Sequence, residues 1–225
     1  MRSEISVGRV VGILLLLQMA SALVFPFVLI DALNRGYPAF LETAAASGVQ
    51  IRAGVTLAFL GMALTLALGV WLYPVLRPHS KSAALWFLAV CAISAALDAV
   101  HNASVISMLA AGEKFAASGG ADSAVYQAWG AAAASMRRSA HIVQLFTVGA
   151  WMATFYVSLW RFRLIPRPLS ALGTICVASQ FTGVTAMMFL GYPALGYLAI
   201  PLAPIHAATA TWLIVKGFPS AEPSA

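Results

Sequence analysis

Charged side chains are scarce in this sequence. Lys, Arg, Asp and Glu together make up 9% of the 225 residues, and 61% of the residues are hydrophobic. A soluble globular domain carries roughly 25% charged residues, because its surface must be solvated. The scarcity therefore excludes an ordinary soluble domain and predicts that most of the chain faces lipid or other apolar helices.

Acidic residues are the scarcer sign, with 7 Asp and Glu against 13 Lys and Arg. A basic excess is typical of nucleic-acid-binding proteins when the charges form a stripe on a soluble domain. Here the basic residues flank apolar runs, where Lys and Arg set membrane topology and contact anionic lipid. The pattern predicts the lipid bilayer as partner, with anionic lipid at cytoplasmic Arg and Lys, and no nucleic acid. It predicts no particular oligomeric state.

Cysteines and catalytic motifs are also nearly absent. Cys91 and Cys176 are the two cysteines, and both lie inside apolar runs, where they are interpreted as small buried hydrophobic side chains. The sequence contains no P-loop, GxGxxG, HExxH or nucleophile elbow. This argues against an enzyme, but intramembrane enzymes often show only scattered polar residues, so enzymatic activity stays open.

Long apolar runs dominate what is present. A membrane-spanning helix needs about 20 apolar residues, and six runs are long enough. We predict an all-α fold, a polytopic membrane protein with a six-helix transmembrane bundle as its single domain over residues 1–218, followed by a disordered tail at 219–225. The predicted spans are 7–30, 51–76, 83–111, 137–160, 169–190 and 194–215.

The segments between these runs suggest short elements. Residues 38–48 begin with Pro and end with Gly, which favours a short interfacial helix. Residues 112–123 are predicted to form a loop. The alanine-rich residues 126–136 are interpreted either as an interfacial helix or as an extension of the following span.

The basic residues also predict an orientation, because cytoplasmic loops carry more Lys and Arg. The side with both termini carries eight, against five on the other side, which predicts cytoplasmic termini. The eight are Arg2, Arg9, Arg77, Lys81, Arg161, Arg163, Arg167 and Lys216, and the five are Arg35, Arg52, Lys114, Arg137 and Arg138.

One polar face lies inside the apolar run 83–111. Asp98, His101 and Asn102 are spaced i, i+3 and i+4, so on a helix they share one face. Polar groups of this kind cost a few kcal/mol each inside a membrane unless they are paired or solvated. At ~1.5 Å per residue, Asp98 lies about 24 Å along the helix, in the outer half of the predicted bundle.

Other polar residues fall at a similar depth. Arg138 and His141 begin the span 137–160, and Arg52 begins the span 51–76. Two interpretations stay open: a clamp between Asp98 and Arg138 or His141, and a small ligand-binding pocket open to the outer face.

Cofactors are a further alternative for the same residues. Asp98, His101 and His141 are candidate metal ligands, although the nearby arginines disfavour a cation. A haem held by His101 and His141 is a further alternative. No cofactor is predicted. Near the midplane, His206 is expected to bond to Gln180 or to helix backbone freed by Pro204, and Gln18 lies at the same depth.

Several segments resemble a bacterial family of uncharacterised membrane proteins, domain of unknown function 4386. The resemblance implies a six-helix, multi-pass protein of the bacterial inner membrane and no established activity. His141 stands where family members often have a histidine, whereas Asp98-x-x-His101 is not part of the family pattern. The segments are 9–16 (RVVGILLL), 72–78 (LYPVLRP), 141–149 (HIVQLFTVG), 158–167 (SLWRFRLIPR) and 213–217 (LIVKG).

Three functions are compatible with these observations. The first is a membrane protein that binds or moves a small or amphipathic molecule through a polar pocket in the outer half of the bundle. The second is an intramembrane metal- or haem-dependent enzyme. The third is a structural or regulatory membrane subunit without a ligand. The isolated polar face favours the first.

Overall fold

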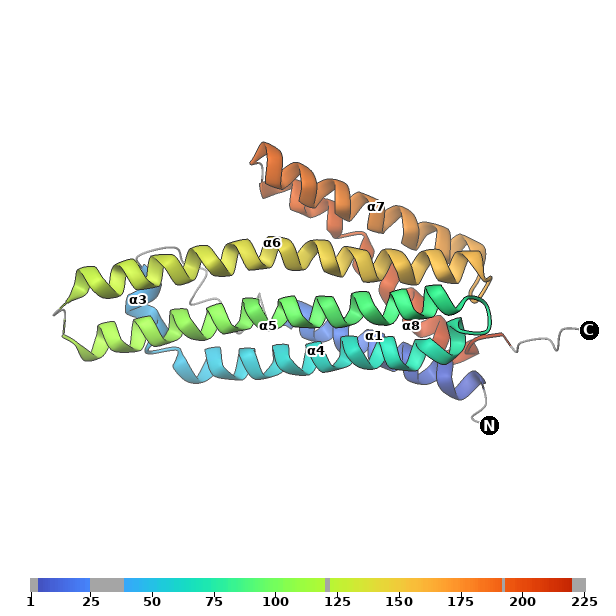
Figure 1. Cartoon of the computed structure of the whole chain (residues 1–225), viewed down its shortest axis with the longest axis horizontal. Helices are drawn as coiled ribbons and strands as arrows, with labels where there is room; N and C mark the ends of the chain where they lie inside the picture. Colours follow the sequence, from blue (N-terminus) through green and yellow to red (C-terminus); the bar gives the residue numbers. More distant parts are fainter. Residues whose placement is uncertain (1–3, 25–38, 120–121, 192, 220–225) are drawn as a thin grey trace, which may run out of the picture. The chain divides into compact units, whose positions relative to one another are not determined.

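The computed structural model describes residues 4–24, 39–119, 122–191 and 193–219. All regular structure within these ranges is helical (Figure 1), which confirms the all-α prediction. The elements are α1 (Glu4–Val24), α3 (Ala39–Ala44), α4 (Gly48–Leu76), α5 (Lys81–Ala117), α6 (Ser123–Arg161), α7 (Arg167–Leu190), η2 (Pro193–Ala199) and α8 (Leu202–Lys216).

Five helical segments are long and apolar enough to cross a membrane, and they agree with five of the predicted spans. The described part of the first predicted span gives a shorter apolar helix, Val7–Leu23. Residues 25–30 of that span, Asp31, Arg35 and residues 220–225 of the predicted tail lie outside the described residues. The five segments are Gly48–Leu76, Lys81–Ala117, Ser123–Arg161, Arg167–Leu190 and Gly196–Lys216.

The connection between α5 and α6 is shorter than predicted. The loop expected over 112–123 is wrong in its first half, because α5 continues to Ala117, and the alanine-rich segment 126–136 extends α6. No proline interrupts either helix, and alanine is the best helix former. At ~1.5 Å per residue the two helices are about 56 and 58 Å long, which exceeds the ~30 Å hydrocarbon core.

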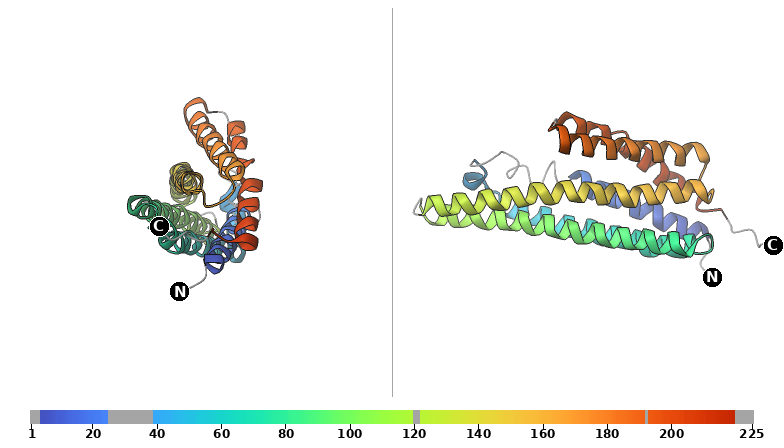
Figure 2. Two further views of the ribbon diagram at one scale, coloured as in Figure 1. Left: turned by 90° about the vertical axis from the view of Figure 1, so that its right-hand side faces the viewer. Right: turned by 45° about the horizontal axis from the view of Figure 1, so that its top comes forward.

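Two prolines lie at the beginning of the last α-helix. After Leu190 the chain turns at Gly191, whose φ is 71°, and η2 lies back along α7 (Figure 2). Here the Ser179 hydroxyl donates to the Leu198 carbonyl at 2.9 Å. Pro201 then caps α8, and Pro204 falls in its first turn, where backbone N–H groups have no intrahelical acceptor.

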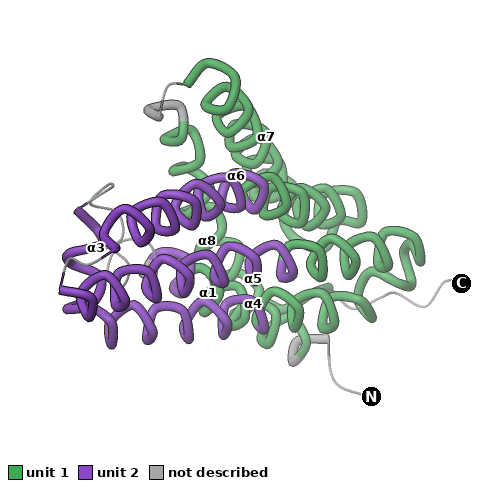
Figure 3. The backbone as a smooth tube through the Cα atoms, turned by 60° about the vertical axis from the view of Figure 1, so that its left-hand side comes forward, with its two compact units in different colours: residues 1–19, 64–94, 145–225 green, residues 20–63, 95–144 purple. Residues whose placement is uncertain are grey.

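The chain forms two compact units, coloured separately in Figure 3. Unit 1 comprises residues 1–19, 64–94 and 145–225, and unit 2 comprises 20–63 and 95–144. The boundaries fall inside α1, α4, α5 and α6. The predicted single domain over residues 1–218 stays a prediction.

Each unit has its own hydrophobic core. The core of unit 1 includes Phe87, Trp151 and Phe155. The core of unit 2 includes Phe40 and Met108. Close backbone packing supports the core of unit 1. A Cβ on Gly8 would lie 2.5 Å from the Cα of Gly217, and one on Gly12 would lie 2.6 Å from the Ala210 carbonyl oxygen. The small residues of α1 therefore let it pack directly against α8, as is common among membrane helices.

Candidate functional site

The polar face predicted on α5 exists and lies in unit 2. His101 and Asn102 are buried, with exposed fractions of 4% and 0%, and Asp98 is half-buried. One turn apart on the helix, the Asn102 side-chain amide Nδ2 donates to Asp98 Oδ1 at 3.5 Å. The same Nδ2 lies 3.9 Å from the Met62 sulfur on α4.

The partner of Asp98 on α6 is Gln144. Gln144 Nε2 donates to Asp98 Oδ1 at 2.6 Å, and the other end of the amide, Oε1, lies 3.3 Å from His141 Nδ1. Because the Gln144 nitrogen donates to Asp98, its oxygen is the acceptor, so His141 Nδ1 carries a hydrogen. We call Asp98, His101, Asn102, His141 and Gln144 the Asp98 cluster.

Two histidine rings also join the helices within the Asp98 cluster. The ring centroids of His101 and His141 lie 5.3 Å apart, with the planes tilted by 40°. His101 is buried, whereas His141 is exposed. The cluster therefore runs from the interior of unit 2 to its surface through His141.

Arg138 does not join the cluster. It is exposed, and within the described ranges no hydrogen bond or ion pair connects it to Asp98. At about 100° per residue, Arg138 lies about 120° around α6 from Gln144, so it is turned away from α5. The clamp expected between Asp98 and Arg138 or His141 is replaced by a bond to a neutral amide.

Arg52 also lies away from the cluster. Its Nη2 is 2.7 Å from Glu113 Oε1, with side-chain exposures of 56% and 38%. Glu113 comes fifteen residues after Asp98 on α5, about 22 Å along the helix. An exposed ion pair of this kind contributes roughly 0–1 kcal/mol. It links α4 and α5 near their ends and supplies no charge to Asp98.

The Asp98 cluster is suited to accept hydrogen bonds from another molecule. Within the described ranges, the donors to the Asp98 carboxylate are the neutral side-chain amides of Asn102 and Gln144. The buried Asn102 Oδ1 has no hydrogen-bond partner within the described part of the chain. A group with N–H donors would complement these oxygens.

The metal alternative concerns the three candidate ligands Asp98, His101 and His141. Among the residues that the structure describes, no group of three or more His, Cys, Asp and Glu side chains is placed to hold a metal ion. That finding covers Asp98, His101 and His141, whose two imidazole rings contact each other.

A second polar cluster lies in unit 1 and was not predicted. His206 Nδ1 is 3.1 Å from the Tyr156 hydroxyl, which lies 3.5 Å from Thr209 Oγ1. The Trp151 ring meets the His206 ring edge-on at 5.9 Å. All four side chains are at most 2% exposed. We call His206, Tyr156, Thr209 and Trp151 the His206 cluster.

The partner predicted for His206 was wrong. Gln180 instead donates through Nε2 to the Leu145 carbonyl at 2.9 Å, and Gln18 lies half-buried on α1. Tyr156 was missed because it comes five residues before the end of α6, where a tyrosine at the membrane interface is ordinary. Gln144 was missed because it carries no charge, although its position three residues after His141 was a usable signal.

Comparison with known proteins gives one match. The family model described as Domain of unknown function (DUF4386) matches residues 10–217, which confirms the resemblance seen in the short sequence segments. No curated protein and no solved structure matches the chain. The family has no described activity, so a function must be argued from the residues of this chain.

Proposed function

We propose that this chain, which belongs to the DUF4386 family, is an integral membrane protein that binds or moves a small or amphipathic molecule through the Asp98 cluster. One observation carries the proposal. The Asp98 carboxylate lies inside an apolar helix, and among the described residues its hydrogen-bond donors are two neutral amides. A purely structural role would favour a basic partner, because an unpaired charge at such a site is costly.

The chemistry of the cluster indicates the polar end of the ligand. Asp98 and Asn102 offer acceptor oxygens, so the ligand should present N–H groups. α5 contains an apolar stretch long enough to cross a membrane, so the remainder of the ligand should be apolar as well. His141, exposed and adjacent to Gln144, provides the outer edge of this site.

The proposal includes an orientation. Six spans with both termini in the cytoplasm would put the Asp98 cluster in the outer half of the bacterial inner membrane. The eight-to-five distribution of basic residues supports it. Reporter fusions after Lys81 and after Asp122 should report opposite sides, the first of them cytoplasmic. The reverse pattern would overturn the orientation and place the cluster on the inner side.

The ligand proposal is tested by Asp98→Asn, with Asp122→Asn as control. Asp122 is exposed, and asparagine tolerates its positive φ of 53°. The full chain is purified in mild detergent, and organic extracts are compared by mass spectrometry together with thermal unfolding. We expect a co-purifying amine-containing molecule that Asp98→Asn loses and Asp122→Asn keeps. The unfolding midpoint should stay unchanged or rise, because the substitution removes a buried charge but keeps an acceptor for Gln144.

The opposite result identifies a structural site. If Asp98→Asn lowers the unfolding midpoint by several degrees and the extracts of all three proteins are identical, the cluster is a clamp between α5 and α6. The ligand proposal is then wrong.

A further inference from the structure

An apolar groove lies between α6 and α7, within unit 1. It has a volume of about 250 Å³ and is lined by Val157, Trp160, Ala171, Thr174 and Ile175. Thr174 is its one polar side chain, and its hydroxyl already donates to the Ser170 carbonyl at 2.9 Å. Val157, Trp160 and Ile175 are 48%, 44% and 62% exposed, so the groove opens outward from the unit. On a membrane-spanning pair of helices, such a groove faces lipid tails.

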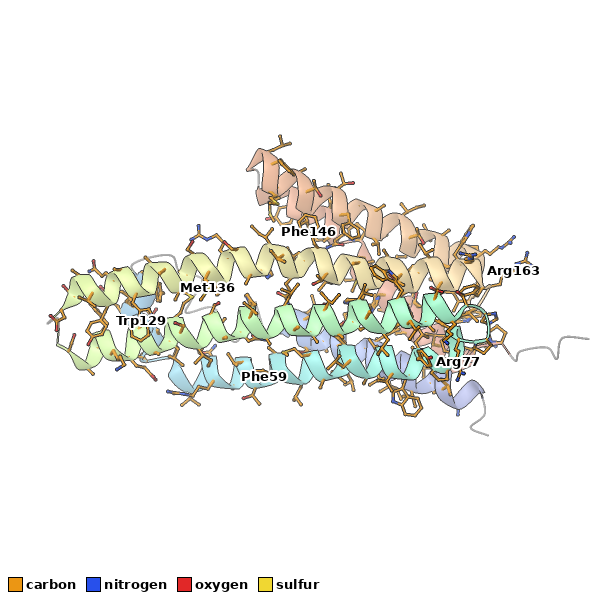
Figure 4. All side chains as sticks on the ribbon, in the orientation of Figure 1. Phe59, Arg77, Trp129, Met136, Phe146 and Arg163 are labelled. Carbon is orange, nitrogen blue, oxygen red and sulfur yellow. The ribbon has the colours of Figure 1, made fainter. Side chains whose placement is uncertain are left out.

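Basic residues gather where these two helices connect. Arg161 ends α6, Arg163 lies in the turn (Figure 4), and Arg167 begins α7. All three are exposed. The guanidinium carbon of Arg167 lies 5.9 Å from the centroid of the Trp160 ring, which is itself a wall of the groove. The apolar groove therefore leads directly to a positive charge.

Nothing acidic in the nearby sequence neutralises these arginines. No Asp or Glu occurs between Asp122 and Glu222. The first turn of α7 contains no acidic residue, and its N-cap, Pro166, provides no side-chain cap. The positive end of the helix dipole adds to the arginine charges. The end of the groove is thus complementary to an anion.

We propose that the α6–α7 groove binds an anionic phospholipid, with part of one acyl chain in the groove and the phosphate held by Arg163 and Arg167. The volume is below the ~300–1,000 Å³ of sites that enclose a whole small molecule, which fits a segment of a chain. Trp160 marks the interface level, where aromatic residues meet lipid headgroups. The inference is independent of the Asp98 cluster, which belongs to unit 2.

The headgroup is tested first, with the delipidated full chain in detergent. Bound lipid is counted by native mass spectrometry during titration with dioleoylphosphatidylglycerol or dioleoylphosphatidylcholine. We expect preference for the anionic lipid, and a loss of about fivefold in its affinity for Arg163→Gln and for Arg167→Gln. Arg138→Gln, at an exposed arginine of α6 that belongs to unit 2, is the matched control and should bind as the natural chain does.

The groove is tested with Ala171→Phe, which fills it, and with Ala178→Phe, at an exposed α7 position outside it, as control. Only Ala171→Phe should weaken binding of the dioleoyl lipid, while dibutyryl phosphatidylglycerol should bind both variants equally. Circular dichroism verifies that each variant is folded.

Three outcomes overturn the proposal. They are equal binding of the two dioleoyl lipids, wild-type affinity in both Arg163→Gln and Ala171→Phe, and displacement of the lipid by inorganic phosphate at the same concentration. A change from dimer to monomer in Ala171→Phe, with lipid binding unaltered, would likewise overturn it and identify the groove as an interface between copies of this chain.

Discussion

The Asp98 cluster of unit 2 and the His206 cluster of unit 1 both place polar side chains among apolar helices, but they differ in charge and exposure. The first contains a carboxylate and reaches the surface at His141. The second contains no acidic residue, and its members are at most 2% exposed. The Tyr156 hydroxyl and His206 Nδ1 are partners across fifty residues of sequence.

The difference separates two uses of polar groups in a membrane protein. Buried partners such as Tyr156 and His206 tie α6 to α8 and expose almost none of their surface to another molecule. A carboxylate whose donors in the described part of the chain are amides lacks a basic partner there, and an ionisable group inside a membrane is costly. Asp98 is therefore the better candidate for function, and His206 for stability.

The largest loss of stability should come from Tyr156→Phe, in the His206 cluster. The change removes the hydroxyl and leaves His206 Nδ1 buried without its partner, which should lower the free energy of unfolding by about 1–3 kcal/mol. Thermal unfolding in detergent provides the measurement, with Tyr197→Phe, at a residue 70% exposed, as control. Adding His206→Leu should restore part of the loss, because the buried imidazole nitrogen that lost its partner is then removed as well. An unchanged midpoint in Tyr156→Phe would remove the stabilising role assigned to this cluster.

A smaller effect is expected in the Asp98 cluster, from Gln144→Leu. This change removes the α6 donor to a carboxylate and should cost about 1–2 kcal/mol, whereas Gln127→Leu, on an exposed face of α6, should cost nothing measurable. The cost should shrink in the Asp98→Asn background, since a neutral amide needs that donor less. The double-mutant cycle measures this coupling, and strictly additive effects would show that the charge of Asp98 is not what Gln144 stabilises.

The helices were predictable because apolar composition and length decide them. Five of the predicted spans agree with helices of the structure to within a few residues at most ends. The exception is the α5–α6 connection, where Gly112 suggested a loop. In the structure Gly112 lies inside α5, and its lack of a side chain serves packing, because a Cβ there would lie 2.7 Å from the Ala44 Cβ of α3. Close packing requires that glycine, and a sequence alone does not separate this requirement from a helix end.

The sequence could predict which polar residues share one side of α5. It could not predict which residues of α6 bond to them. The i, i+3, i+4 spacing places Asp98, His101 and Asn102 together, because it depends only on one helix. Pairing across helices depends on the rotation of α6, which brings Gln144 and not Arg138 to Asp98. The sequence favoured the charged residue on electrostatic grounds, and the helix rotation decided otherwise.

The smallest effect should come from Arg52→Gln. This substitution tests whether the Arg52–Glu113 ion pair is independent of the Asp98 cluster. Arg52 was expected to share the depth of Asp98, but it pairs with Glu113 at the exposed end of α5. Both partners are largely solvated, so the loss should be below about 1 kcal/mol and should shrink further in high salt. Thermal unfolding at two salt concentrations provides the measurement, and Glu113→Gln should give a loss of the same size. If Arg52→Gln instead removed a molecule that Asp98→Asn also removes, Arg52 would belong to the ligand site despite the roughly 22 Å along α5 that separates Glu113 from Asp98.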